Sequence, residues 1–195
     1  MQFLFETCDT PQAYTDGSGK YPDAPEKCPH KGCHAPLQMK KHGFYKRYII
    51  TRGFTGNIRI RRYICTLCVH TVSMLPSFCI PRIQYGVEVI LTALLIAAEH
   101  SSVRYAGTRW PERPLTLTRR HIIYYRDRII RNRGIIQLAL NLMSPAFIEL
   151  KQITGDIGWT RKFLQAASQL KPPQFNAKYH DLTGKSFMSL HNNVA

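Results

Sequence analysis

The chain has 195 residues, 44% of them hydrophobic, so it can bury an ordinary core and a mostly disordered chain is excluded. Its 27 Lys and Arg against 12 Asp and Glu give a net charge of +15, which predicts a polyanionic partner, first of all nucleic acid. Residues 40–133 hold 18 basic and 4 acidic residues, a concentration that favours a dedicated binding surface over a generally basic protein.

Residues 1–27 are rich in Gly, Pro, Ser and Asp and predict a loosely ordered lead-in, with one short strand candidate at Phe3-Leu-Phe5. Cys8 is expected to be a small buried side chain rather than a metal ligand. The first residues lack a basic leader followed by a long apolar segment, so we expect no secretory signal. The use of the six cysteines agrees with a reducing compartment, and we expect a cytoplasmic protein.

Residues 28–81 predict a zinc β-ribbon. Two close cysteine pairs, separated by 31 residues, each supply two thiolates from one tight turn, as a tetrahedral zinc site needs. The predicted ligands of one structural Zn²⁺ are Cys28, Cys33, Cys65 and Cys68. Six cysteines could also form three disulfides, and such a disulfide framework is the weaker alternative. Gly32 is expected to supply a positive φ in the first turn, and His30 and His34 are expected at the surface rather than in the metal shell.

The stretch between the cysteine pairs predicts two strands, residues 43–50 and 57–64, joined by a turn at residues 53–56. In the second strand Ile58 and Ile60 alternate with Arg59 and Arg61, the period of a half-buried strand. We expect one basic face with interleaved tyrosines that rests on phosphates, formed by Lys46, Arg47, Arg59 and Arg61. The alternative is a solvated face whose charge only keeps the protein soluble.

An apolar, proline-bracketed segment, residues 71–81, is expected to strap the ribbon to the next module, with Cys79 in the core and a domain boundary near Pro81. Residues 85–100 predict the central core helix of that module. Its longest apolar run, residues 93–98, is too short to span a bilayer, so no membrane segment is expected.

Residues 82–171 predict a helix-turn-helix-like domain, with a short second helix over residues 101–110 and a third helix between Thr118 as cap and Gly134 as stop. The third helix places isoleucines on one face and is the candidate for the DNA major groove. Its predicted DNA-binding residues are Arg119, Arg120, Tyr124, Arg128 and Arg131. Helical geometry places Arg126 among the isoleucines. Either its aliphatic stem packs there while its guanidinium reaches solvent, or the helix is rotated about its axis from the orientation predicted here. A merely solvated basic helix is the alternative.

Further helices are expected over residues 134–151, broken at Ser144-Pro145, and over residues 159–170. Residues 172–195 lack strong periodicity but carry enough aromatic residues to predict a tail packed on the body. The predicted fold class is therefore α+β, an N-terminal zinc β-ribbon followed by a helical module.

The cysteine pairs, together with the strand Arg59-Ile-Arg-Ile-Arg-Arg-Tyr-Ile and the segments Leu75-Pro-Ser-Phe and Ser186-Phe-Met-Ser-Leu-His, resemble small zinc-ribbon proteins associated with bacterial transposons. The likeness is to the zinc-ribbon and helix-turn-helix front end of insertion-sequence transposases, and it runs from about Cys28 onward. It implies DNA binding in a mobile-element setting.

No strand-borne carboxylate triad for two divalent cations is recognisable, so the sequence predicts no enzyme in this chain alone. It predicts a double-stranded DNA-binding, nucleoid-associated accessory or regulatory factor of a transposon, with a protein partner from a transposition complex and with homo-oligomerisation left open. The alternative is an RNA-binding zinc ribbon of the translation or transcription machinery, whose tyrosines stack on bases. A catalytic subunit completed by a partner's acids is a third, weaker hypothesis.

Overall fold

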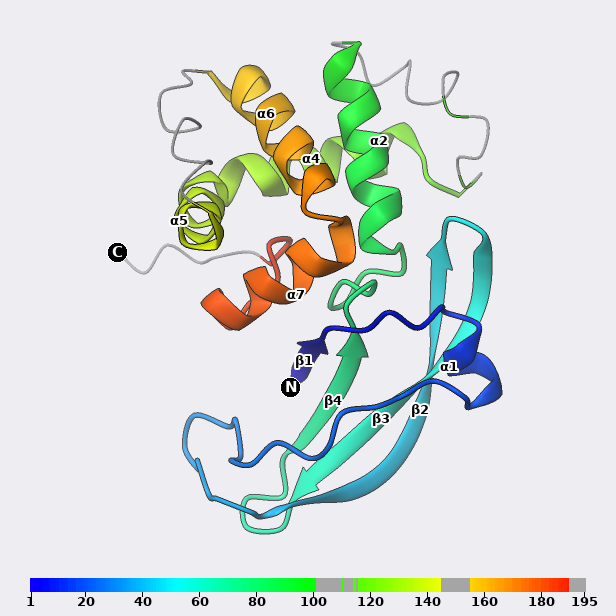
Figure 1. The fold of residues 1–195 in the computed structure, drawn as a ribbon, viewed down its shortest axis with the longest axis vertical. Coiled ribbons are helices and arrows are strands. Elements are labelled where there is room, and N and C mark those ends of the chain that lie inside the picture. The colour runs from blue at the N-terminus through cyan, green and yellow to red at the C-terminus, as the bar shows by residue number, and fades with distance from the viewer. Residues whose placement is uncertain (101–109, 111–113, 115, 145–154, 190–195) are drawn as a thin grey trace.

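A computed structural model describes residues 1–100, 110, 114, 116–144 and 155–189, and shows an α+β fold (Figure 1). The sheet has four strands in the order β1-β4-β3-β2, with β1 parallel to β4 and the other neighbours antiparallel. The strands are β1 Gln2–Phe5, β2 Met39–Thr51, β3 Phe54–Cys65 and β4 Thr71–Pro76. The described helices are α1 Ala13–Asp16, α2 Val87–Glu99, α4 Arg119–Arg131, α5 Arg133–Met143, α6 Asp156–Gln169 and α7 Pro172–Thr183. The predicted α+β class is confirmed.

Strands β2 and β3 form the long hairpin that the alternation of Ile58 and Ile60 predicts, and both isoleucines are buried. Thr51 pairs with Phe54, so the turn is Arg52-Gly53 rather than residues 53–56. Gly53 has a φ of 93°, which a residue with a Cβ adopts only at a cost. The strands are therefore longer than expected and run on to the cysteine-bearing end of the hairpin.

The predicted strand at Phe3-Leu-Phe5 is confirmed as β1, whereas the rest of residues 1–21 is more ordered than the predicted lead-in. Strand β1 pairs with β4 through Phe3–Met74 and Leu4–Leu75, far apart in sequence. Helix α1 buries Tyr14, whose hydroxyl donates to the carbonyl of Lys20 at 3.0 Å. A Cβ on Gly19 would lie 2.7 Å from the Tyr14 ring, so this glycine permits the close approach.

Strand β4 replaces the expected strap. It lies between β1 and β3 and so belongs to the interior of the sheet, where its side chains from Val72 to Pro76 are buried. Cys79 beyond it is fully buried, as predicted, whereas Cys8 is exposed, so the prediction of a buried Cys8 is wrong. Burial raises the pKa of the Cys79 thiol to about 12, which leaves it a small apolar side chain.

Helices α2 and α4 to α7 pack around one apolar core, to which α2 contributes a nearly continuous buried face. Helix α4 begins at the predicted cap, Thr118, which forms a capping box with His121. Ile122 and Ile129 are buried on its inner side. Arg126 is not buried among them, because its guanidinium pairs with Asp127 at 3.0 Å and the side chain stays 44% exposed.

The chain continues from α4 into α5 through a single residue, so the predicted stop at Gly134 is wrong. That residue, Asn132, is buried and its amide donates to the carbonyls of Phe187 and Ser189, both at 2.7 Å. The helix predicted over residues 101–110 lies, apart from residue 110, outside the described residues. Residues 111–113 and 115 also lie outside them. The turn that a helix-turn-helix requires before α4 therefore stays a prediction.

The segment predicted as a tail forms helix α7, whose Phe175 and Tyr179 are buried against the helical core. Asn176 on the same helix donates to the carbonyls of Ser77 and Cys79, at 2.7 and 2.8 Å. Two prolines stand at its start, where the missing N–H groups cost no helical hydrogen bond. Helix α7 thus joins the sheet to the helical layer, on the side where Figure 1 shows it beside β1.

Candidate metal centre and basic surfaces

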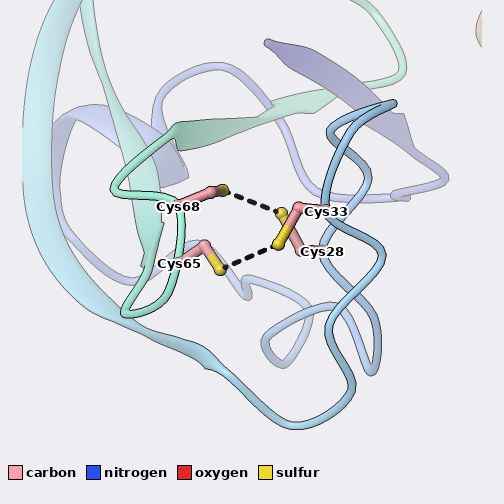
Figure 2. Close-up of side chains that lie close together, drawn as sticks. All are labelled: Cys28, Cys33, Cys65 and Cys68. Atoms are coloured by element: carbon pink, nitrogen blue, oxygen red, sulfur yellow. Dashed lines mark hydrogen bonds between the residues drawn. The ribbon is translucent and has the colours of Figure 1, made fainter.

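The four predicted ligands converge at one end of the hairpin (Figure 2). Cys65 is the last residue of β3 and Cys68 lies in the turn after it, and Cys28 and Cys33 face them from the loop before β2. The Sγ atoms of Cys28 and Cys68 are 3.6 Å apart, and those of Cys33 and Cys65 are 3.8 Å apart. All four sulfurs lie within 4.8 Å of one another.

These separations are those of a metal tetrahedron. Zinc–sulfur bonds of about 2.3 Å place the sulfurs of a tetrahedral site about 3.8 Å apart, whereas a disulfide needs about 2.05 Å. Every cysteine is a free thiol, so the disulfide alternative is wrong. The predicted set Cys28, Cys33, Cys65 and Cys68 can hold one metal ion.

Backbone amides point at the sulfurs from within each turn. The N–H groups of Cys68 and Leu67 lower the pKa of the Cys65 thiol to about 7, which favours the thiolate that a metal requires. Burial raises the pKa of Cys28 to about 12, although the N–H of His30 opposes that shift. A bound cation would bring all four sulfurs to the thiolate form.

In both tight turns, the residue that follows the second cysteine of the pair has a left-handed backbone conformation. His34 has a φ of 50° and Val69 a φ of 60°, while Gly32, for which a positive φ was predicted, does not have one. The amide of Val69 donates to the carbonyl of Cys65 at 2.9 Å and fixes this geometry. A β-branched residue in the left-handed region is strained, and the metal turn holds it there.

We expect Val69→Gly to raise the free energy of unfolding of the metal-loaded protein by about 1 kcal/mol, because glycine adopts this φ without the Cβ clash. The side chain is 68% exposed, so little burial is lost. Urea denaturation of the metal-loaded protein measures the effect. Val69→Ala keeps a Cβ and is the matched control that should gain much less. A lower stability for the glycine variant would contradict the strain argument.

Two histidines lie beside the cluster. His30 and His70 stack with ring centroids 3.6 Å apart, and both approach the sulfur of Cys68. The Nδ1 of His70 is 2.9 Å from the carbonyl oxygen of Cys68, and His34 is exposed. The sequence reasoning did not single out His70, although its position two residues after Cys68 was the signal available.

On the hairpin, three of the four predicted basic residues share one strand face. Lys46 is paired with Arg59, and Phe44 with Arg61. The guanidinium carbons of Arg59 and Arg61 lie over the Phe44 ring, 4.4 and 3.9 Å from its centroid. The aromatic ring thus holds two cations side by side at the surface.

The placement of Arg47 on this same face is wrong. Neighbouring residues of a strand point to opposite faces, and Arg47 is paired with Ile58 rather than with an arginine. Its guanidinium donates to the carbonyls of Ile80 and Ile83, at 2.7 and 2.8 Å. Arg47 therefore fixes the connection between sheet and helices.

On α4, the predicted residues Arg119, Arg120 and Arg131 are exposed, and Tyr124 is 48% exposed. Arg128 is half-buried, because its guanidinium donates to the carbonyl of Met188 and lies 4.5 Å from the Tyr124 ring centroid. The helix thus presents a solvent-facing basic stripe, with Arg128 turned toward the body.

Residues 28–110 match the model of a family described as a domain of unknown function (DUF6431). The match covers the cysteine cluster, the hairpin, β4 and α2. Neither a curated protein nor a solved structure matches the chain. Among the described residues no helix is both long and apolar enough to cross a membrane.

Proposed function

We propose that the protein binds double-stranded DNA through cations displayed on the hairpin and on α4, and that a structural Zn²⁺ in the four-cysteine cluster stiffens the hairpin. The proposal names the partner by its chemistry, a polyanion with regularly spaced phosphates. It assigns the metal no part in a reaction, since four protein thiolates fill a tetrahedral shell and leave no open position.

One observation carries this proposal. No Asp or Glu occurs between Glu26 and Glu88, while that stretch contains 11 Lys and Arg. The sheet and the metal turns are therefore positive with no acidic side chain of their own to neutralise them. Because such a surface is costly without a counter-charge, a phosphate backbone is its best match.

Four thiolates in a tetrahedron favour Zn²⁺ among the common divalent cations, with iron as the other metal that such a set takes. Elemental analysis of purified protein tests this assignment. We expect one zinc per chain, and iron or no metal would contradict it.

The transposon setting, an accessory or regulatory role with a protein partner from the transposition complex, rests on the sequence resemblance. The exposed tyrosine and arginine side chains also keep RNA as the second candidate. Competition between duplex DNA and structured RNA at several salt concentrations separates the two. Preference for RNA would overturn the DNA proposal.

We expect Arg120→Ala with Arg131→Ala to weaken duplex DNA binding about tenfold at low salt. The two residues are eleven positions apart, about three helical turns, so they lie on one side of α4. Each lost phosphate contact should also reduce the slope of log K against log salt by about 0.9. The measurement is fluorescence anisotropy across a salt series.

The matched control is Lys162→Ala with Lys178→Ala, which removes the same charge from exposed positions on α6 and α7. If both pairs weaken binding equally, the effect is one of net charge and α4 is not the contact. If the α4 pair has no effect, the variant Lys46→Ala with Arg59→Ala tests the hairpin face.

A further inference from the structure

A cleft of about 970 Å³ lies between the sheet and the helical layer, and of the predicted DNA-binding residues only Tyr124 and Arg128 line it. One wall comes from all four strands and the turn at residues 81–83, and the other from α4, the end of α7 and residues 184–189. Its cations are Arg62, Arg82, Arg128 and Lys185, and no Asp or Glu is among its described lining residues. The cleft is therefore positive on both walls.

Each wall also carries a tyrosine next to one of these arginines. The guanidinium carbon of Arg62 is 6.0 Å from the ring centroid of Tyr45, and that of Arg128 is 4.5 Å from the Tyr124 ring. The Nε atoms of both arginines and the hydroxyl of Tyr45 are buried without a hydrogen-bond partner. Buried polar atoms are usually paired, so these groups favour a ligand that supplies acceptors.

Arg82 stands at the rim in a conformation that arginine does not favour. Ile80-Pro81-Arg82-Ile83 has the features of a type II turn, with proline second, the amide of Ile83 donating to Ile80 at 3.1 Å, and a φ of 64° at Arg82. Glycine suits that third position best. Arg47 holds the turn by its bonds to both end carbonyls. Strain that is held in place by neighbouring groups is typical of functional sites.

We infer that this cleft binds a single-stranded segment of DNA, with phosphates on the four cations and bases stacked on Tyr124 and Tyr45. This inference rests on the proposed DNA-binding function and adds the form of DNA. A positive groove with aromatic platforms is how proteins hold single strands. The cleft volume suits a few nucleotides.

The variant Arg82→Gly tests the inference without threatening the fold, because glycine relieves the positive φ while the charge is lost. We expect affinity for a labelled twelve-residue oligo-dT to fall about tenfold, with the salt slope reduced by about 0.7, and the melting temperature to stay equal or rise. Tyr124→Leu should weaken the same binding roughly tenfold through lost stacking. Affinity for a blunt duplex should stay within about twofold for Arg82→Gly, since Arg82 lies outside both proposed duplex-binding surfaces.

Lys178→Ser on the outer side of α7 is the control for net charge and should leave oligo-dT binding unchanged. The inference is overturned if Arg82→Gly and Tyr124→Leu bind oligo-dT as the wild type does, while duplex binding by the wild type would still support the proposed function. If the wild type binds neither DNA form, the proposed function itself fails.

Discussion

We expect Cys65→Ser to abolish metal binding and to unfold the ribbon end of the sheet. Cys65 is fully buried at the last position of β3, and two amides that point at its sulfur lower its pKa to about 7. A serine hydroxyl does not ionise near neutral pH and is a poor zinc ligand, so three thiolates would remain.

The expected effect is large because little else holds this end together. The apolar cluster around the cysteines is small and consists of Cys28, Met39, Tyr63, Cys65, Val72 and Met74, with partly buried neighbours. Zinc binding contributes about 10–16 kcal/mol in small zinc domains, as much as the whole stability of an ordinary protein. Loss of the metal should therefore unfold this end of the sheet and not only make it more flexible.

Elemental analysis and hydrogen exchange of the amides in residues 28–41 and 62–72 measure the two effects. The matched control is Cys8→Ser, since Cys8 is an exposed thiol outside the cluster and its replacement should change neither readout. A Cys65→Ser protein that keeps full metal occupancy would show that the four sulfurs are not the ligand set.

The metal cluster could be predicted from sequence because its geometry is encoded locally. Each cysteine pair lies in one tight turn, so spacing alone brings two sulfurs together, and the alternation of Ile58 and Ile60 predicts the hairpin that joins the pairs. The same alternation, applied to β2, would have separated Arg47 from Lys46. Arg47 and Lys46 were assigned to one face because both are basic, although the position of a residue along the strand decides its face.

Other features were missed because they depend on contacts between distant residues. The strand at Phe3-Leu-Phe5 was predicted, but its parallel pairing with β4 some seventy positions later, as in the pair Gln2–Ser73, was not, because nothing within residues 1–27 encodes that partner. The cleft likewise joins Arg62, Arg82 and Lys185 from three separate segments. The first two of these arginines lie in the stretch between Glu26 and Glu88 that contains no carboxylate, but that stretch holds 11 Lys and Arg and does not distinguish them from the others.

We expect Asn176→Leu to lower the free energy of unfolding by about 3 kcal/mol. The Asn176 side chain is fully buried, and its amide is the donor to two carbonyls, those of Ser77 and Cys79, just after β4. Leucine has a similar volume but no donor, so two buried acceptors are left unpaired at about 1–3 kcal/mol each. For a chain of this length the melting temperature should fall by roughly 6–12 °C.

Asn176→Asp separates hydrogen bonding from packing, because it keeps the shape and replaces the donor by an acceptor. Burial next to two carbonyls should raise the pKa of the new carboxyl above its value in the unfolded chain, about 3.9. Above that value the unfolded state binds fewer protons than the native state, so the stability of the variant relative to wild type should fall as pH rises. Urea denaturation at pH 4 and pH 7 measures this difference, with Lys178→Ala on the same helix as the exposed control. Equal losses at both pH values would mean that the amide does not hold α7 to the sheet through these two carbonyls.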